Sequence, residues 1–242
     1  MASNCPRELH RPPVESGPPC HPHTMTTTHV YTHIRRYVCL ALAAAAFMML
    51  GLPQQVSAKP MPQGQERVIA QSAKEAIAIF DSLTELSAAD RSDVFSALVA
   101  DIARQAAIFL GVDVRAMQQA WLAADLAHQR ALVNGLTQLG VPYKLNSAIE
   151  NVAFDCSGLV AFAWGKVGVG MTHGSSAQFA SATRVKVEDA QPGDLIWRPG
   201  HISMYLGVQS AVLQTPYSGR SVELQLMNER ISSWVKYANP LI

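Results

Sequence analysis

Cys156 is the residue of this chain best placed to act as a nucleophile. It follows Asp155, a residue type that often caps a helix N-terminus, so we expect it in the first turn of a short helix over residues 154–167. Unpaired N–H groups and the positive end of the helix dipole favour a thiolate there and lower the pKa of a cysteine. The same N–H groups can hold the charge that develops on an attacked carbonyl oxygen. The small residues Ser157 and Gly158 would let a substrate backbone come close.

A thiolate needs a base, and three histidines follow residue 58. His128 lies inside a predicted helix among Ala and Gln, where we expect it at the surface, and His173 lies in a predicted loop. His201 opens a predicted strand directly after a turn at residues 198–200, which can aim a side chain outward from the end of a sheet. His201 is therefore the candidate general base. The alternative is a polar residue that merely begins an edge strand.

Gln214 is the candidate third member of the site. If the strand that begins at His201 forms a hairpin with residues 211–214, with Ser203 opposite Gln214, then His201 and Gln214 share one face of the sheet. Their backbones would be about 7–8 Å apart, within reach of a long side chain. A Gln oxygen can accept a hydrogen bond from one ring nitrogen of the histidine and leave the other nitrogen for the nucleophile.

The elements that must position these residues change in type along the chain. Residues 67–140 are rich in alanine, and their apolar spacing predicts three helices: over 67–86, from a Ser87 cap to about 110, and from an Asp113 cap to near 140. Short β-like runs follow at 194–198, 201–206, 211–214 and 221–226. Helices followed by a meander of strands are typical of an α+β fold with an antiparallel sheet.

The first 58 residues have the features of a targeting segment. Arg35 and Arg36 precede an apolar run over 37–52, and small residues follow up to Ala58. A basic region, an apolar stretch and a cleavage-like site are the parts of a secretory signal peptide, so we expect export with cleavage near Ala58. An uncleaved membrane anchor is the alternative, although the run is shorter than the roughly 20 residues that a spanning helix needs. Residues 1–24 match no targeting element, and Met25 is an alternative start.

Composition narrows the function classes. Hydrophobic residues make up 49% and charged residues 15%, which argues against a disordered chain, and the net charge of +1 gives no support for nucleic-acid binding. Cleavage near Ala58 would leave Cys156 as the only cysteine, so the mature chain could form no internal disulfide. A small buried hydrophobe is the alternative role for such a cysteine. No zinc-like Cys/His spacing follows residue 58, and we expect neither a metal nor an organic cofactor.

Four short blocks together resemble the NlpC-type family of cell-wall endopeptidases, a branch of the papain-like cysteine peptidases. They are GVPY at 140–143, FDCSGLV at 154–160, QPGDLI at 191–196 and HISMYLG at 201–207. The resemblance implies Cys156 as nucleophile, His201 as general base and acid, and Gln214 as the residue that orients His201. It also implies an oxyanion and substrate-binding role for Tyr143, Asp155, Ser157 and Ser175, and a structural turn at Asp194. The chain departs from the family at Gln214, where histidine is usual, and at residues 144–148, which replace a glycine-rich stretch.

The resemblance implies an organisation and a substrate. We expect a signal and upstream extension at 1–58, a helical region at 59–124 and an NlpC-type catalytic domain at 125–242. The expected activity is hydrolysis of the peptidoglycan stem peptide, between D-γ-glutamate and a diamino acid such as meso-diaminopimelate or lysine, outside the cytoplasm by a monomer. The helical region would be a cap or a docking element for a cell-envelope protein. A papain-like acyltransferase and a catalytically silent cell-wall-binding module are the alternatives.

Overall fold

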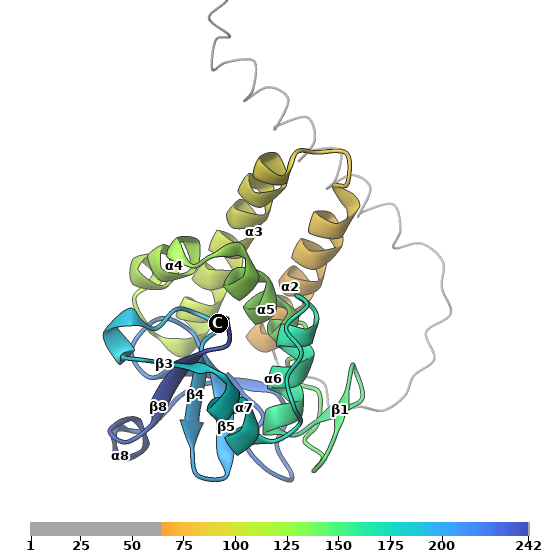
Figure 1. The fold of residues 1–242 in the computed structure, drawn as a ribbon. Helices are drawn as coiled ribbons and strands as arrows, with labels where there is room; N and C mark the ends of the chain where they lie inside the picture. The colour runs from red at the N-terminus through yellow and green to blue at the C-terminus, as the bar shows by residue number, and fades with distance from the viewer. Residues whose placement is uncertain (1–63, 242) are drawn as a thin grey trace, which may run out of the picture. The chain divides into compact units, whose positions relative to one another are not determined.

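The computed structural model describes residues 64–241, and Figure 1 shows their helices and the strands of an antiparallel sheet. The helices are α2 Gln65–Ser82, α3 Ala88–Leu110, α4 Val114–Ala123, α5 Leu126–Leu136, α6 Cys156–Gly165, α7 Ser175–Ser181, η1 Val187–Asp189 and α8 Glu229–Ser232. The strands are β1 Ala148–Ile149, β2 Ala153–Phe154, β3 Thr183–Val185, β4 Leu195–Arg198, β5 His201–Tyr205, β6 Ala211–Gln214, β7 Glu223–Leu226 and β8 Lys236–Asn239. The expected signal peptide and Met25 lie outside the described residues. None of the helices within 64–241 is both long and apolar enough to cross a membrane.

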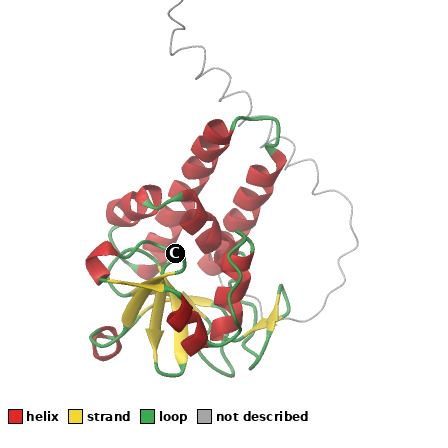
Figure 2. Ribbon diagram, in the orientation of Figure 1, coloured by secondary structure: helices red, strands yellow, loops and turns green. Residues whose placement is uncertain are grey.

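The main sheet has six strands in the order β3-β8-β4-β5-β6-β7, and every adjacent pair is antiparallel (Figure 2). Helices fill the first part of the described chain and the strands of this sheet follow, so the predicted α+β fold is confirmed. Strands β4 to β7 follow one another as the expected meander, although β7 begins two residues later than predicted. The sequence reading missed the last strand, β8, which lies between β3 and β4.

The register of the central hairpins sets the position of the candidate site. Strands β4 and β5 are joined by Pro199 and Gly200 alone, and Gly200 has a φ of 79°, a left-handed conformation that favours glycine. The turn places Arg198 directly opposite His201. In the next hairpin Met204 pairs with Leu213, which is the register that the predicted pairing of residue 203 with residue 214 requires.

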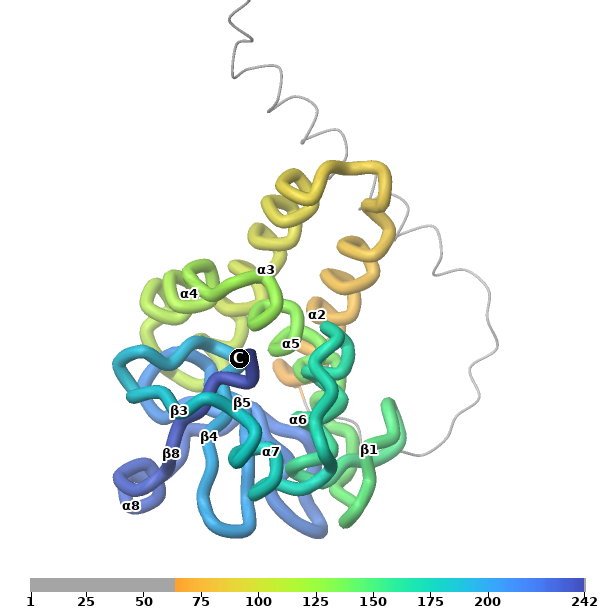
Figure 3. Tube along the Cα trace, viewed as in Figure 1, coloured from red at the N-terminus to blue at the C-terminus, as the bar shows by residue number. Residues whose placement is uncertain are grey.

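The predicted third helix is wrong in one respect, because it is two helices. α4 ends at Ala123, the backbone at Ala124 is extended, and Asp125 begins α5 by accepting a hydrogen bond from the backbone of His128. α5 then ends at Leu136, short of the expected end near residue 140. The break turns α5 against α6, so the helix that carries Cys156 packs between α5 and strand β5. The tube in Figure 3 follows this path from α4 through α5 to α6.

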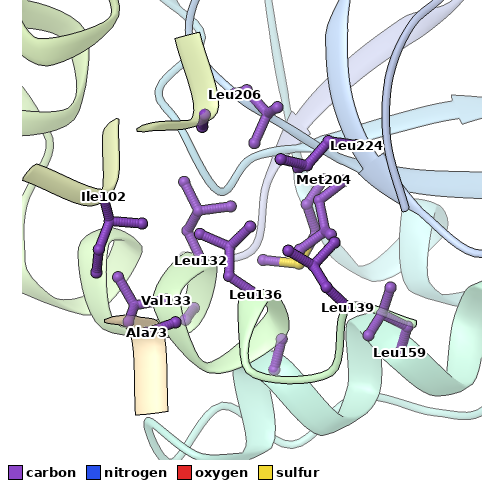
Figure 4. Close-up of a cluster of buried hydrophobic side chains, with 14 of the residues drawn as sticks. Ala73, Ile102, Leu132, Val133, Leu136, Leu139, Leu159, Met204, Leu206 and Leu224 are labelled. Carbon is purple, nitrogen blue, oxygen red and sulfur yellow. The ribbon is translucent and has the colours of Figure 1, made fainter. Parts of the chain in front are cut away.

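The helical region and the sheet share one hydrophobic core. Figure 4 shows Ala73 of α2 and Ile102 of α3 in the same cluster as Leu132 and Leu136 of α5 and as Leu224 of the sheet. The fully buried Trp121 of α4 also donates from its indole Nε1 to the carbonyl oxygen of Leu206, at 2.8 Å. The domain boundary at residue 124 stays a prediction. The described part of the chain buries apolar side chains continuously across it.

His128 is fully buried, so the expectation that it lies on the surface is wrong. Its Nδ1 lies 2.7 Å from Asp125 Oδ2 and its Nε2 lies 3.0 Å from Asp194 Oδ1, which ties α5 to the start of β4. Asp194 also accepts a hydrogen bond from the backbone of Gln191, the turn-forming role expected for it. Burial lowers the pKa of His128, but the hydrogen bond and charge of Asp194, with those of Asp125, outweigh it and leave the pKa raised.

The raised pKa of His128 predicts a loss of stability on the alkaline side. A folded pKa above the unfolded value of about 6.5 gives stability that is complete below the unfolded pKa and is lost as pH rises through the folded pKa. We expect the melting temperature to fall across that window in the wild type, and not in His128→Gln. Calorimetry at a series of pH values tests this. His201→Ala is the control and should keep the alkaline fall, because the pKa of His201 is shifted the other way.

Candidate active site

Cys156 is the first residue of α6, as its position after Asp155 predicts. The carboxylate of Asp155 caps the helix: Oδ1 accepts from the backbone N–H of Gly158 at 2.7 Å and from the hydroxyl of Ser157 at 3.0 Å. Oδ1 also lies 2.9 Å from His173 Nε2, and Oδ2 accepts from the backbone of Asn146 at 2.7 Å. The start of the helix is therefore fixed by contacts from two separate loops.

The segment before α6 passes very close to the helix. A Cβ added at Gly158 would lie 2.1 Å from the carbonyl oxygen of Ser147, far inside contact distance. That same oxygen accepts the backbone N–H of Asp155 at 2.8 Å. Gly158 is thus required by a close approach of two backbones, and this approach holds the residue before the nucleophile in place.

The thiol of Cys156 is half-buried, and α6, which begins at this residue, packs against strand β5. Burial raises the pKa of Cys156, the charge of Asp155 raises it further, and the N–H groups of Ile202, Ser157 and Cys156 only partly offset these effects. The predicted lowering of the pKa by the helix N-terminus is therefore wrong for the free protein, because burial outweighs the helix end.

His201 and Gln214 meet as the hairpin register predicts. The ring Nε2 of His201 lies 2.9 Å from Oε1 of Gln214, and both side chains are buried. An amide oxygen can only accept, so this contact places the ring hydrogen on Nε2 and leaves Nδ1 with a free lone pair. Gln214 donates in turn from Nε2 to Oε1 of Gln225, at 2.6 Å.

Burial lowers the pKa of His201, the hydrogen bond to Gln214 offsets part of this effect, and the positive charge of Arg198 lowers the pKa a little further. With the pKa of Cys156 raised and that of His201 lowered, burial favours the neutral thiol and the neutral imidazole. Such an imidazole can act as a general base toward the thiol at the moment of attack.

The structure places the other predicted site residues in different surroundings. Tyr143 is half-buried, and burial raises the pKa of its phenol, with smaller effects of Cys156 and Asp155 in the same direction. The hydroxyl of Ser157 is turned onto Asp155. Ser175 begins α7, and its side chain makes no hydrogen bond to the pair within the described residues.

Two residues near the site were missed by the sequence reading. Gln178 of α7 is fully buried and donates from Nε2 to the carbonyl oxygen of Ser157 at 2.8 Å, which ties α7 to the first turn of α6. Gln225 lies on β7, the strand next to Gln214. Its position one strand beyond Gln214 could have been found only by extending the predicted pairing to the last hairpin.

The structure joins an α+β fold to a thiol at the N-terminus of α6 and a histidine, held by Gln214, on the strand that packs against α6. Residues 140–237 match the NlpC/P60 family. The family predicted from the four sequence blocks is therefore confirmed for this part of the chain.

Curated relatives and solved structures are similar to parts of this chain. A peptidoglycan endopeptidase RipA of Mycolicibacterium smegmatis is 30% identical over 124 residues, which are 45% of this chain and 24% of the relative. Among solved structures, the P60 domain of antigen MAP1204 from M. avium subspecies paratuberculosis is 22% identical, with a TM-score of 0.43 over 48% of this chain and 96% of that one. RipD from Mycobacterium tuberculosis, described as a non-catalytic NlpC/p60 domain protein, is 22% identical with a TM-score of 0.40 over 49% of this chain and all of that one, 100%. The chain thus spans only about a quarter of the first curated relative.

Proposed function

We propose that this protein is an exported cysteine endopeptidase that hydrolyses the stem peptide of peptidoglycan. The observation that carries the proposal is the packing of helix α6 against strand β5. Helix α6 begins at Cys156 and packs against β5, which begins at His201, and His201 is held by Gln214 with Nδ1 free. The match of residues 140–237 to the NlpC/P60 family and the endopeptidase relatives support the substrate class.

The neutral pair suggests how the reaction starts. His201 Nδ1 takes the proton of Cys156 as the sulfur attacks the amide carbonyl, and the N–H groups of the first turn of α6 hold the oxyanion. The imidazolium then gives its proton to the leaving amine. A water molecule, deprotonated by the neutral His201, cleaves the thioester and releases the acid. Tyr143, Asp155, Ser157 and Ser175 are proposed to shape the oxyanion and substrate-binding region around these two residues.

The finer assignments rest on the resemblance and on the N-terminal sequence. The proposed bond lies between D-γ-glutamate and a diamino acid, meso-diaminopimelate or lysine. The proposed location is the periplasm or cell wall, reached by cleavage near Ala58, which agrees with a substrate outside the cytoplasm. The protein is proposed to act as a monomer without a cofactor and without nucleic acid.

The test is product analysis. Purified sacculi and defined muropeptides are incubated with wild type and with Cys156→Ala, and the products are identified by mass spectrometry. We expect new stem-peptide fragments with free termini from the wild type alone. A transferred acyl group in place of a free acid would indicate the acyltransferase alternative, and an absence of any new fragment would contradict the proposed hydrolysis.

A silent cell-wall-binding module is the second candidate, and Gln214, in the place where histidine is usual, is the observation that favours it. Thiol labelling would not separate the two functions, because a neutral resting thiol is slow toward iodoacetamide in either case. Sedimentation with sacculi separates them when it is combined with the product analysis. A silent module would bind sacculi equally well as wild type and Cys156→Ala and would release no fragment with either.

The helices before residue 124 are proposed as a docking element for a cell-envelope partner or as a cap. Three exposed apolar side chains support a docking surface: Val68, Ile108 and Leu122. The core that these helices share with the sheet supports a fixed position for them.

A further inference from the structure

Glu223 is a buried acid on the far side of Gln214 from His201. It begins β7 and is the direct cross-strand partner of Gln214, so the two side chains lie on the same face of the sheet. Glu223 is 7% exposed. Its Oε2 accepts from Arg220 at 2.6 Å, whereas its Oε1 is buried and has no hydrogen-bond partner in the part of the chain that the structure describes.

The amide of Gln214 has a donor to spare for this acid. Its oxygen accepts from His201, and one of its two N–H hydrogens goes to Gln225. The second hydrogen is available on the side of the directly paired Glu223. Interaction with Gln214 is one of the effects that lower the pKa of Glu223, against the larger effect of burial, which raises it, and alongside the charge of Arg220, which lowers it.

Gln225 alone does not fix which way the Gln214 amide faces. Gln225 is itself an amide, and its oxygen and nitrogen can exchange places by a half-turn of the group, so it can serve either end of Gln214. An ionised carboxylate can only accept hydrogen bonds. The charged groups around Glu223 are Arg220 in the preceding turn and Glu66 of α2, whose Oε1 lies 3.5 Å from the backbone nitrogen of Leu224.

We propose that Glu223 is a positioning residue whose carboxylate holds the NH2 of Gln214 on its own side and thereby keeps the Gln214 oxygen on His201. This role rests on the proposed function, because it concerns the tautomer in which His201 acts as the base of that reaction. A Gln214 amide turned the other way would present its NH2 to His201 Nε2. The ring hydrogen would then move to Nδ1, and Nδ1 could not take the proton of Cys156.

The experiment reads the tautomer of His201 directly. Nitrogen-15 NMR of the full chain labelled at histidine distinguishes a hydrogen on Nε2 from one on Nδ1. The wild type is expected to carry it on Nε2, and Glu223→Gln is expected to show a mixture with Nδ1–H. Because a misplaced tautomer costs a histidine base about 10⁴-fold in kcat, activity follows the fraction of molecules with a free Nδ1, and we expect kcat to fall about tenfold in this variant.

Two further variants distinguish this positioning role from a general disturbance of the packing around Gln214 and Glu223. Glu66→Gln removes the neighbouring carboxylate, and the His201 tautomer should stay as in the wild type. The exchange Gln214→Glu with Glu223→Gln puts the acceptor-only group directly on His201 and should restore the Nε2–H form, whether or not Glu223→Gln folds well alone.

Three results would overturn the proposal: an Nδ1 hydrogen in the wild type, an unchanged tautomer in Glu223→Gln, or an Nδ1–H form that persists in the exchange variant. The NMR signal needs no substrate. A protein that cleaves no stem peptide but shows the expected tautomers would contradict the proposed function and leave the role of Glu223 standing.

Discussion

Replacing His201 with alanine is expected to lower kcat/KM for stem-peptide hydrolysis by about 10³-fold, and adding Cys156→Ala is expected to lower it little further. General base catalysis by a histidine contributes about 10² to 10⁴-fold, and residues that act as one unit lose their effects together rather than additively. His201 and Cys156 are proposed to form such a unit, because burial raises the pKa of the thiol, which then needs a base in order to attack.

Steady-state kinetics of the two single variants and the double variant on one defined muropeptide measure this effect. His173→Ala is the matched control, since its ring contacts the capping Asp155 instead of Gln214, and we expect a much smaller fall in kcat. A double variant with the full product of the two single losses would show that the residues act independently. That result would contradict the pairing.

Gly158→Ala is expected to destabilise the protein strongly, although it adds a single methyl group in a helix. The new Cβ would lie 2.1 Å from the carbonyl oxygen of Ser147, so the segment before α6 must move and the hydrogen bond from Asp155 to that oxygen is strained. Overpacking of this kind costs about 1–3 kcal/mol of unfolding free energy, and in a protein of this size about 3 kcal/mol lowers the melting temperature by roughly 6–12 °C.

Gly165→Ala is the control for Gly158→Ala, because both glycines lie in α6 and an added Cβ at Gly165 meets no atom within 4 Å. Alanine there should be neutral or stabilise the helix by up to about 1 kcal/mol. Thermal unfolding of the two variants beside the wild type measures the difference. Equal melting temperatures for the two variants would contradict the close approach at Gly158.

The sequence predicted the site well where local rules decide geometry. Asp155 caps a helix that begins at Cys156 because capping depends on neighbouring residues, and His201 reaches Gln214 because the hairpin register follows from turn length. The roles of these residues in catalysis stay predictions until activity is measured.

Predictions from the sequence were wrong where residues far apart in the chain decide the burial or the pKa of a side chain. His128 has polar neighbours in sequence, but it is buried in the fold, where its ring lies between Asp125 and Asp194, which are 69 positions apart in the numbering. The pKa of Cys156 depends on its burial against β5, which a helix-end argument does not include. Glu223 lies next to Gln214 only because β6 and β7 pair, and no sequence motif marks Glu223.

The indole hydrogen bond from Trp121 to Leu206 couples the unfolding of the helices to that of the sheet. Since α4 and the end of β5 are joined inside one apolar core, the helices cannot be released while the sheet stays intact without exposing that core to water. We therefore expect residues 64–241 to melt in a single cooperative transition. A protease cut between α4 and α5 would then unfold the sheet together with the helices. Cys156 and His201 would lose their fixed positions as a result.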